Sequence, residues 1–348
     1  MKCEGVARRS RLIMRRWDWR LRFAAPFDDK EIMNTFPSRL ISSLGSAVFA
    51  SWLLVAAQNA SAEIAVKSGE KIAFLGDSIT AAGWGNPAGY VRLVMAGLEV
   101  NGVKAEAIPA GVGGHKSNQM LARLEKDVIS KKPQWMTLSC GVNDVWHAKR
   151  GVPLDDTEAA AKALGIEGAP DPGRGTYKKN ITQIVEKATA AGARVMILTA
   201  TVIQEDPKTP ENAKLAPYNE FLRQLASEKH LALADLNAAF QERLKAENKP
   251  NQKVLTVDGV HMNTAGNELM AAVILKTFGL DEAQLAKARE SWKPLEVKAE
   301  EEAAKKAAEA KAKAAAVKAK ADAEKAKAAG ATPSVPSVPS VPSVPAGK

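Results

Sequence analysis

The sequence predicts an α/β protein with one three-layer, doubly wound domain built on a five-stranded parallel sheet. Short apolar runs alternate with amphipathic stretches from residue 63 to about residue 280. Strands that alternate with helices imply right-handed crossovers and a parallel sheet covered on both faces. A second observation is the segment AAGARVMILTA, where a glycine ends a helical stretch directly before a buried strand.

Each element of this fold is expected at a particular stretch. The strands are predicted at residues 71–76, 104–110, 135–141, 194–200 and 231–236, and the helices at residues 90–100, 118–130, 177–191, 213–229, 236–246 and 264–278. Because chemistry gathers at the carboxyl ends of parallel strands, functional residues are expected just after each strand. The long connection 148–176 leaves the same edge, and it either shapes a substrate cleft or is a surface excursion.

The C-terminal part differs in kind from the domain, which we place at residues 63–290. Residues 296–329 are mostly Ala, Lys and Glu, which favours a solvated single helix. A Ser-Val-Pro repeat follows in residues 330–348 and favours extended polyproline geometry. This tail either associates the protein with a cell envelope or only keeps it soluble.

Residues 33–62 are typical of a cleavable signal peptide. Arg39 supplies the positive start, an apolar stretch covers residues 40–57, and small residues at 60–62 suit cleavage near Ala62. We therefore expect a secreted or periplasmic protein that starts at Met33; an uncleaved anchor is the alternative. Residues 1–32 are rich in Arg and Trp without a periodic apolar face, and are interpreted as an upstream start artefact or a disordered segment.

The net charge of +10 does not indicate nucleic-acid binding by the domain. Residues 1–62 carry ten Lys and Arg against five Asp and Glu, and residues 296–348 carry ten against seven, so most of the excess lies at the two ends. The two cysteines, Cys3 and Cys140, form neither a metal-ligand spacing nor a disulfide framework. Carboxylates do not cluster with spaced histidines, so we expect no metal and no cofactor.

Four short motifs stand at or near the expected active edge. They are GDS at 76–78, GVGGHKS at 111–117, GVND at 141–144 and DGVH at 258–261, and the first three follow successive strands. Singly each is weak, because Gly, Asp, Asn and Ser favour turns for local reasons. Together, and in this order, they resemble the four blocks of the SGNH hydrolases, the GDSL esterase/lipase superfamily. The resemblance covers roughly residues 70–279 and implies a flavodoxin-like fold and an ester hydrolase.

The resemblance also implies roles for individual residues. Ser78 matches the nucleophile, His261 its general base, and Asp258 the acid that orients this base. The oxyanion hole would consist of the N–H groups of Ser78 and Gly114 and the side-chain amide of Asn143. These residue types suit acyl transfer, since a serine hydroxyl needs an adjacent base, histidine exchanges protons near neutral pH, and a tetrahedral oxyanion needs fixed donors.

The second motif departs from the family pattern. Pro109 and Gly113 stand where family members often carry Asn and Ser, so the hydrogen bonds that brace the oxyanion loop are expected to differ. Asp77 is expected to bind loop amides. Four more side chains are candidates for substrate contacts: Trp84, His115, Trp146 and His147. For the tryptophans the alternative is core packing, and for the histidines it is an exposed loop position.

These observations predict a secreted serine ester hydrolase that acts on carboxylic esters, with acetyl esters of carbohydrates as the first choice. The export signal, the tryptophans near the cleft and the lack of a strongly apolar lid segment favour this substrate class over long-chain lipids. A lysophospholipase or thioesterase is the enzymatic alternative. The other alternative is a non-catalytic envelope protein that binds carbohydrate with the same fold.

Overall fold

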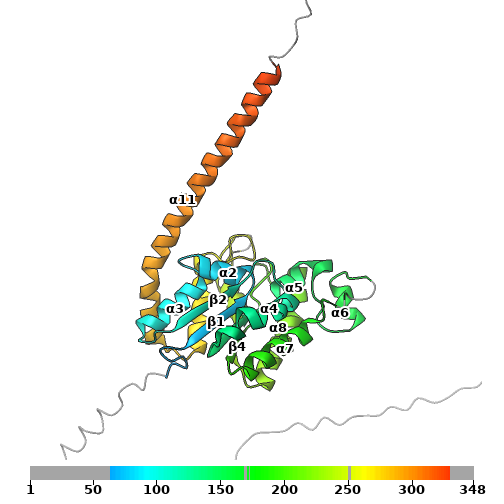
Figure 1. Cartoon of the computed structure of the whole chain (residues 1–348), viewed down its shortest axis with the longest axis vertical. Coiled ribbons are helices and arrows are strands. Elements are labelled where there is room, and N and C mark those ends of the chain that lie inside the picture. Colours follow the sequence, from blue (N-terminus) through cyan, green and yellow to red (C-terminus); the bar gives the residue numbers. More distant parts are fainter. Residues whose placement is uncertain (1–62, 168–170, 172, 250–251, 330–348) are drawn as a thin grey trace, which may run out of the picture. The chain divides into compact units, whose positions relative to one another are not determined.

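The computed structural model describes residues 63–329, apart from 168–170, 172 and 250–251. The predicted leader (33–62), the segment before it and the Ser-Val-Pro tail (330–348) lie outside the described residues. Within them, the chain folds into a sheet with helices on both faces (Figure 1).

All five strands of the sheet are parallel, and their order is β2-β1-β3-β4-β5. They are β1 (Lys71–Gly76), β2 (Glu106–Gly111), β3 (Trp135–Ser139), β4 (Arg194–Leu198) and β5 (Ala232–Ala234). Strands buried on both faces read as continuous apolar runs, and β3 is buried along its whole length. Pro109 fits because β2 is an edge strand, where a missing backbone donor is tolerated. The predicted doubly wound α/β fold is confirmed.

Helices connect these strands and cover the sheet. They are α2 (Ser78–Gly85), α3 (Tyr90–Val100), α4 (Ser117–Asp127), α5 (Val142–Trp146), α6 (Glu158–Ala163), α7 (Tyr177–Ala190), α8 (Pro210–Glu228), α9 (Leu236–Glu247), α10 (Thr264–Thr277) and α11 (Glu282–Ala329), with 3₁₀ turns η1 (Ile129–Lys131) and η2 (Ala148–Arg150). Helix α3 packs against α10 and α11, whereas α4 packs against α7 and α7 against α8. A single hydrophobic core runs between the sheet and these helices.

Three short helices occupy stretches without a predicted helix: α2, α5 and α6. The first two begin directly after the carboxyl ends of β1 and β3, so Ser78 and Asn143 lie in the first turn of a helix. Strand order reverses around β1, whose neighbours are β2 and β3. The crevice outside the carboxyl ends at such a point is where doubly wound proteins bind ligands.

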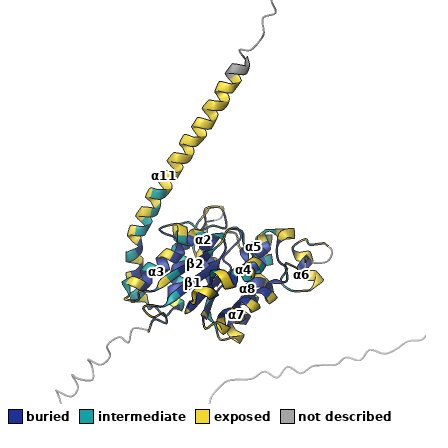
Figure 2. Cartoon of the chain, in the orientation of Figure 1, coloured by how far each residue is buried: buried dark blue, intermediate teal, exposed yellow. Residues whose placement is uncertain are grey.

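Helix α11 begins at Glu282, earlier than the predicted residue 296 and inside the predicted domain. Its first turns belong to the core: Leu285, Ala288 and Trp292 are buried, and Trp292 Nε1 donates to the Leu93 carbonyl at 2.9 Å. From residue 303 to 325 every side chain is exposed (Figure 2). None of the described helices is long and apolar enough to cross a membrane.

The long connection between β3 and α7 contains α5, η2 and α6. Its described ends are tied down: Arg174 Nη1 donates to the carbonyls of Lys149 at 2.8 Å and Gly151 at 3.1 Å, and the N–H of Tyr177 donates to the Pro153 carbonyl at 2.8 Å. That this connection shapes a substrate cleft stays a prediction.

Candidate active site

Ser78 is the first residue of α2, directly beyond the carboxyl end of β1. Asp77 caps the helix and accepts a hydrogen bond from Ile79 N at 2.9 Å. The N–H of Ser78 has no acceptor within the helix, because the first N–H groups of a helix lack intrahelical partners. The positive end of the helix dipole also favours negative charge here. The turn chemistry of GDS therefore places the serine where an oxyanion would be stabilised.

His261 lies between Ser78 and Asp258 in space. In the sequence, His261 and Ser78 are 183 residues apart. His261 Nε2 is 2.9 Å from Ser78 Oγ, and His261 Nδ1 is 2.7 Å from Asp258 Oδ2. An ionised carboxylate only accepts, so Nδ1 carries the proton and Nε2 presents its lone pair to the serine hydroxyl. The structure thus brings together three residues predicted from the sequence, in the order that nucleophile activation requires.

The Asp258 carboxylate is held in its charged form. Partial burial opposes its ionisation, but hydrogen bonds from the His261 side chain and from the N–H groups of His261 and Val260 outweigh this effect and lower its pKa to about 2. Asp258 Oδ1 accepts from Val260 N at 2.9 Å and from His261 N at 2.8 Å. A carboxylate so fixed can orient the imidazole and stabilise its protonated form.

The predicted oxyanion donors differ in readiness. Gly114 has φ +73, in the left-handed region that favours glycine, and a Cβ built on it would meet no atom within 4 Å. Its N–H has no hydrogen-bond partner among the described residues. The Asn143 amide is already engaged, because Nδ2 donates to Asp77 Oδ2 at 3.3 Å and to the His115 carbonyl at 3.2 Å. Because the amide has only two N–H groups and both are engaged, an oxyanion would have to replace one of these acceptors. Both contacts are long and therefore weak.

Asp77 is a buried carboxyl next to the nucleophile. Burial is the main cause that raises its pKa to about 6, and the hydrogen bond from Ile79 N opposes the rise. Its two oxygens serve the helix cap and the Asn143 amide, as expected for a residue that binds loop donors. Keeping this group charged at neutral pH destabilises the folded protein.

We expect the variant Asp77→Asn to be more stable relative to the natural chain at pH 7 than at pH 4. Between the ordinary pKa of 3.8 and the folded value of about 6, the folded protein holds a proton that the unfolded chain releases. The free energy of unfolding therefore falls as pH rises through this window, by about 2–3 kcal/mol. Asparagine removes this dependence. Urea unfolding of both proteins at pH 4 and pH 7 measures it, and an equal difference at both pH values would contradict it.

His115 follows Gly114 in the oxyanion loop and is partly buried. Arg123 Nε donates to His115 Nδ1 at 3.1 Å, so the other ring nitrogen carries the proton. Burial, followed by the charges of Arg123 and Lys116, lowers the pKa of His115. Arg123 also donates to the Gly76 carbonyl at 2.8 Å, and thereby links this loop to the strand that ends before Ser78. The sequence reasoning missed Arg123, because nothing distinguishes it among the charged residues of its helix.

Asp144 is the second residue, after Arg123, that holds the motif GVGGHKS in place. It is fully buried and accepts from Ser117 N at 3.0 Å and from Ser117 Oγ at 2.6 Å. Burial is the main cause that raises its pKa, against the hydrogen bonds from Ser117. Arg123 and Asp144 therefore anchor the loop after β2, in which Gly113 departs from the family pattern; Pro109, the other departure, lies within β2. Asp144 lies in the motif GVND, in which the family resemblance implies a role only for its neighbour Asn143.

The candidate substrate contacts fall into two groups. Trp146 ends α5 with 41% of its surface exposed, and its ring stacks on His147 with centroids 6.2 Å apart. Burial, followed by the charges of Lys116 and Arg150, lowers the pKa of His147. Trp84, in contrast, packs partly against the core, and the Arg92 guanidinium lies 3.6 Å from its ring centroid. One face of Trp84 is thus occupied within the protein.

Comparison with known proteins assigns the chain to a family. The sequence profile of the GDSL-like lipase/acylhydrolase family matches residues 74–269, which include every residue of the candidate site. An acetylxylan esterase from Geobacillus stearothermophilus is 28% identical over 235 residues, covering 62% of this chain and 97% of the relative.

Solved structures give the same result. The crystal structure of a catalytic mutant of an acetylxylan esterase from Geobacillus stearothermophilus is 25% identical, with a TM-score of 0.50 over 62% of this chain and 97% of that chain. The structure of another variant of an acetyl xylan esterase from this organism is 25% identical, with a TM-score of 0.51 over 62% of this chain and 98% of that chain. The chain therefore belongs to the GDSL-like lipase/acylhydrolase family and is a carboxylic ester hydrolase.

Proposed function

We propose that this protein removes acetyl groups from carbohydrates by a serine mechanism that uses Ser78, His261 and Asp258. The observation that carries the proposal is the hydrogen-bonded series from Ser78 Oγ through the His261 ring to the Asp258 carboxylate. Similarity to acetylxylan esterases supports the acetyl group and the sugar as the two halves of the ester. With the leader expected at residues 33–62, the enzyme acts outside the cytoplasm in this proposal.

The geometry supports a two-step acyl transfer. Ser78 Oγ attacks the ester carbonyl while His261 Nε2 takes the hydroxyl proton. The oxyanion of the tetrahedral intermediate accepts from the N–H groups of Ser78 and Gly114 and from the Asn143 amide. Collapse breaks the bond to the sugar oxygen, which receives the proton from His261 and leaves an acetyl group on Ser78. Water then attacks this ester with the same base, releases acetic acid and restores the serine.

Trp146 is the side chain that we propose to contact the sugar. It lies three residues after Asn143 on the same short helix and is partly exposed. Among the described residues before α11, the exposed large hydrophobic side chains are Val112, Trp146 and Val257. Each stands within three residues of Gly114, Asn143 or Asp258 in the sequence, which favours a place for these side chains near the predicted chemistry. An aromatic ring beside the ester offers a flat surface to a pyranose.

Acetate release from acetylated xylo-oligosaccharides tests the substrate class. We expect turnover of these substrates and of p-nitrophenyl acetate, and a decline as the acyl chain lengthens. The variant Trp146→Ala should raise KM for the oligosaccharide about tenfold, in line with the loss of 1–1.5 kcal/mol of aromatic contact, and should leave KM for p-nitrophenyl acetate unchanged.

Trp292→Phe provides a tryptophan control far along the chain, in the core contact with α3 rather than beside the site. Equal KM changes for both substrates in Trp146→Ala would contradict a sugar contact. Preference for long acyl chains would instead favour the lysophospholipase or thioesterase alternative, and lack of any ester turnover would overturn the proposal.

A further inference from the structure

The loop that carries Asp258 and His261 has little regular structure of its own. In the described residues 252–263 the only pairing is an isolated antiparallel bridge between Thr256 and Met262. The N–H of Val257 also donates to the His261 carbonyl at 2.8 Å, so the loop closes on itself around Asp258. Something outside the loop must therefore fix its orientation toward Ser78.

The Glu205 carboxylate binds three consecutive residues of this loop. Glu205 Oε2 accepts from Val254 N at 2.6 Å, and Oε1 accepts from Leu255 N at 3.0 Å, Thr256 N at 2.6 Å and Thr256 Oγ1 at 2.5 Å. Successive N–H groups that converge on one carboxylate form an anion-binding nest. Hydrogen bonds to a charged acceptor are about twice as strong as neutral ones. Glu205 is thus the main polar attachment described for this part of the loop.

The attachment continues from Thr256 to the residues between Asp258 and His261. Thr256 is buried, and its hydroxyl oxygen accepts from Gly259 N at 3.0 Å while its proton goes to Glu205. Gln204, next to Glu205, donates its N–H to the Gly259 carbonyl at 2.8 Å. Both groups of the Gly259 backbone are therefore held, directly or through Thr256, by the segment after β4.

Backbone conformation marks the same contact. Gly259 has φ +102, a conformation that other residues rarely adopt, and a Cβ built on it would lie 2.5 Å from Gln204 Oε1, so a side chain there would be strained and would displace the Gln204 amide. Gln204 itself has φ +65, a conformation that side-chain-bearing residues rarely adopt. Such a strained residue persists where its surroundings hold it, and often beside a functional site.

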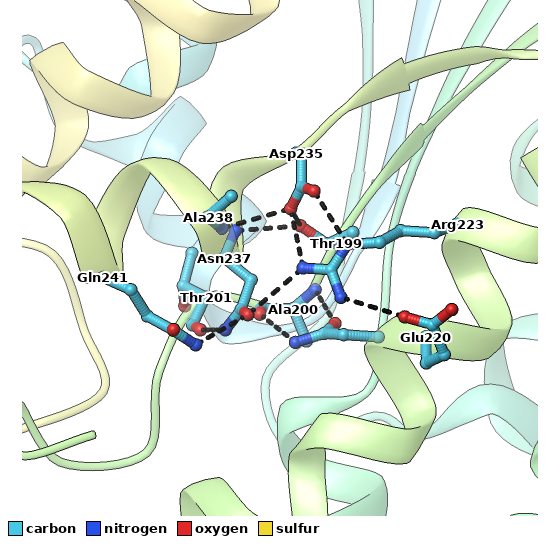
Figure 3. Close-up of polar contacts among 10 residues, drawn as sticks. Thr199, Ala200, Thr201, Glu220, Arg223, Asp235, Asn237, Ala238 and Gln241 are labelled. Atoms are coloured by element: carbon cyan, nitrogen blue, oxygen red, sulfur yellow. Dashed lines mark hydrogen bonds and ion pairs between the residues drawn. The ribbon is translucent and has the colours of Figure 1, made fainter. Parts of the chain in front are cut away.

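The segment that carries Glu205 starts from a well-fixed edge of the sheet. Figure 3 shows the polar network at the carboxyl ends of β4 and β5, where Asn237 Nδ2 donates to the Thr201 carbonyl at 2.6 Å. Thr199 Oγ1 donates to Asp235 Oδ1 at 2.9 Å, and Arg223 Nε donates to Asp235 Oδ2 at 2.8 Å. The segment that leads to Glu205 therefore starts from a part of the sheet that hydrogen bonds hold in place.

We propose that Glu205 is a positioning residue for the reaction: it holds the 254–261 loop so that His261 Nε2 meets Ser78 Oγ. The proposal rests on the function proposed above. The described hydrogen bonds of Glu205 go to Val254, Leu255 and Thr256 rather than to Ser78 or His261, so it acts through Thr256 and Gly259. A displacement of about 1 Å at the base is enough to lower the rate roughly 100-fold.

The test uses Glu205→Gln, with Asp206→Asn as the matched control in the full chain. Glutamine keeps the size of the side chain but removes its charge and turns an NH₂ group toward the N–H groups of the loop. Asp206 loses the same charge one residue away, and its carboxylate accepts from Lys208 N instead of the loop. We expect kcat for p-nitrophenyl acetate to fall roughly 10- to 100-fold in Glu205→Gln with KM within twofold, and no change in Asp206→Asn.

A second readout reports the position of the base without turnover. The proton between His261 Nδ1 and Asp258 Oδ2 should give a downfield NMR resonance in the natural chain and in Asp206→Asn, and this resonance should weaken or broaden in Glu205→Gln. Unchanged kcat together with an unchanged resonance in a folded Glu205→Gln protein would overturn the proposal. A fall in kcat with this resonance intact would overturn it as well.

Should Glu205→Gln fail to fold, Thr256→Val decides the question, since it removes only the hydroxyl that joins Glu205 to Gly259. We expect kcat to fall there about 3- to 10-fold, and an unchanged kcat would count against the proposal. The proposed function fails separately, through inactivity of the natural chain or full activity of Ser78→Ala. An active natural chain, an inactive Ser78→Ala and a normal Glu205→Gln would reject only the role of Glu205.

Discussion

Replacing Ser78 by alanine is expected to lower kcat for acetyl esters by at least about 10⁴-fold. On the proposed mechanism, the variant removes the only atom that would form the acyl-enzyme, whereas the proposed oxyanion donors and the proposed sugar contact stay in place. Residues of a catalytic triad act as a unit, so loss of the nucleophile removes most of the contribution of His261 as well. Stopped or steady-state assays with p-nitrophenyl acetate measure the loss, and binding of acetylated xylo-oligosaccharide should persist.

Ser130→Ala is the matched control for this experiment. Ser130 donates to the Lys126 carbonyl at 2.8 Å near the end of α4 and lies away from the candidate site. It should retain full activity. Residual turnover in Ser78→Ala within tenfold of the natural chain would show that another group supplies the nucleophile, and the serine mechanism would have to be abandoned.

Asp258→Asn is expected to lower kcat by about 10³- to 10⁴-fold, with little change in stability. Asparagine can keep the carbonyl-type acceptor that binds Val260 N and His261 N, but it places an amide donor opposite His261 Nδ1. The imidazole then adopts the other tautomer, in which Nε2 carries the proton and cannot accept one from Ser78. The same exchange has an effect of about 10⁴-fold in a well-studied serine protease.

The pH dependence of activity distinguishes a change of the His261 tautomer from the mere loss of the Asp258 charge. Since the pKa of Asp258 is about 2, its carboxylate stays ionised throughout pH 5–9 and adds no step to the natural profile there. In Asp258→Asn, His261 is held in the tautomer that cannot accept the serine proton. Activity should partly recover as pH rises, because hydroxide can then act as the base in its place. Asp171→Asn, in an exposed turn where Asp171 accepts from Gly173 N, is the control. Activity within tenfold of the natural chain in Asp258→Asn would contradict the orienting role.

The features most predictable from the sequence were those with a local cause. The apolar runs at β1, β3 and β4 are buried on both faces and read as strands without ambiguity. Ser78 and Asn143 lie in short motifs at strand ends, and His261 lies in a short motif before the last helix of the predicted domain. Helices α2 and α5 were missed because they are short and start with turn-forming residues. Their helical periodicity has too few residues to register.

Features with a distant cause could not be predicted in this way. Glu205 lies among several acidic and turn-forming residues, and only the folded chain shows that its carboxylate meets a loop 50 residues further on. The start of α11 was misplaced for a different reason. Composition rich in alanine, lysine and glutamate begins only near residue 296. The helix itself starts earlier, where Leu285, Ala288 and Trp292 recur at helical spacing and face the core.

The separation between Ser78 and His261 bears on how the enzyme comes into being. The serine belongs to the first strand-to-helix turn of the domain, and its base arrives 183 residues later, after β5 and α9. In a chain synthesised from its amino end, Ser78 therefore emerges long before His261, and the proposed nucleophile lacks its proposed base for most of that interval. On the proposed mechanism, esterase activity begins only when the 254–261 loop has reached Ser78, so hydrolysis reports completed folding of the domain.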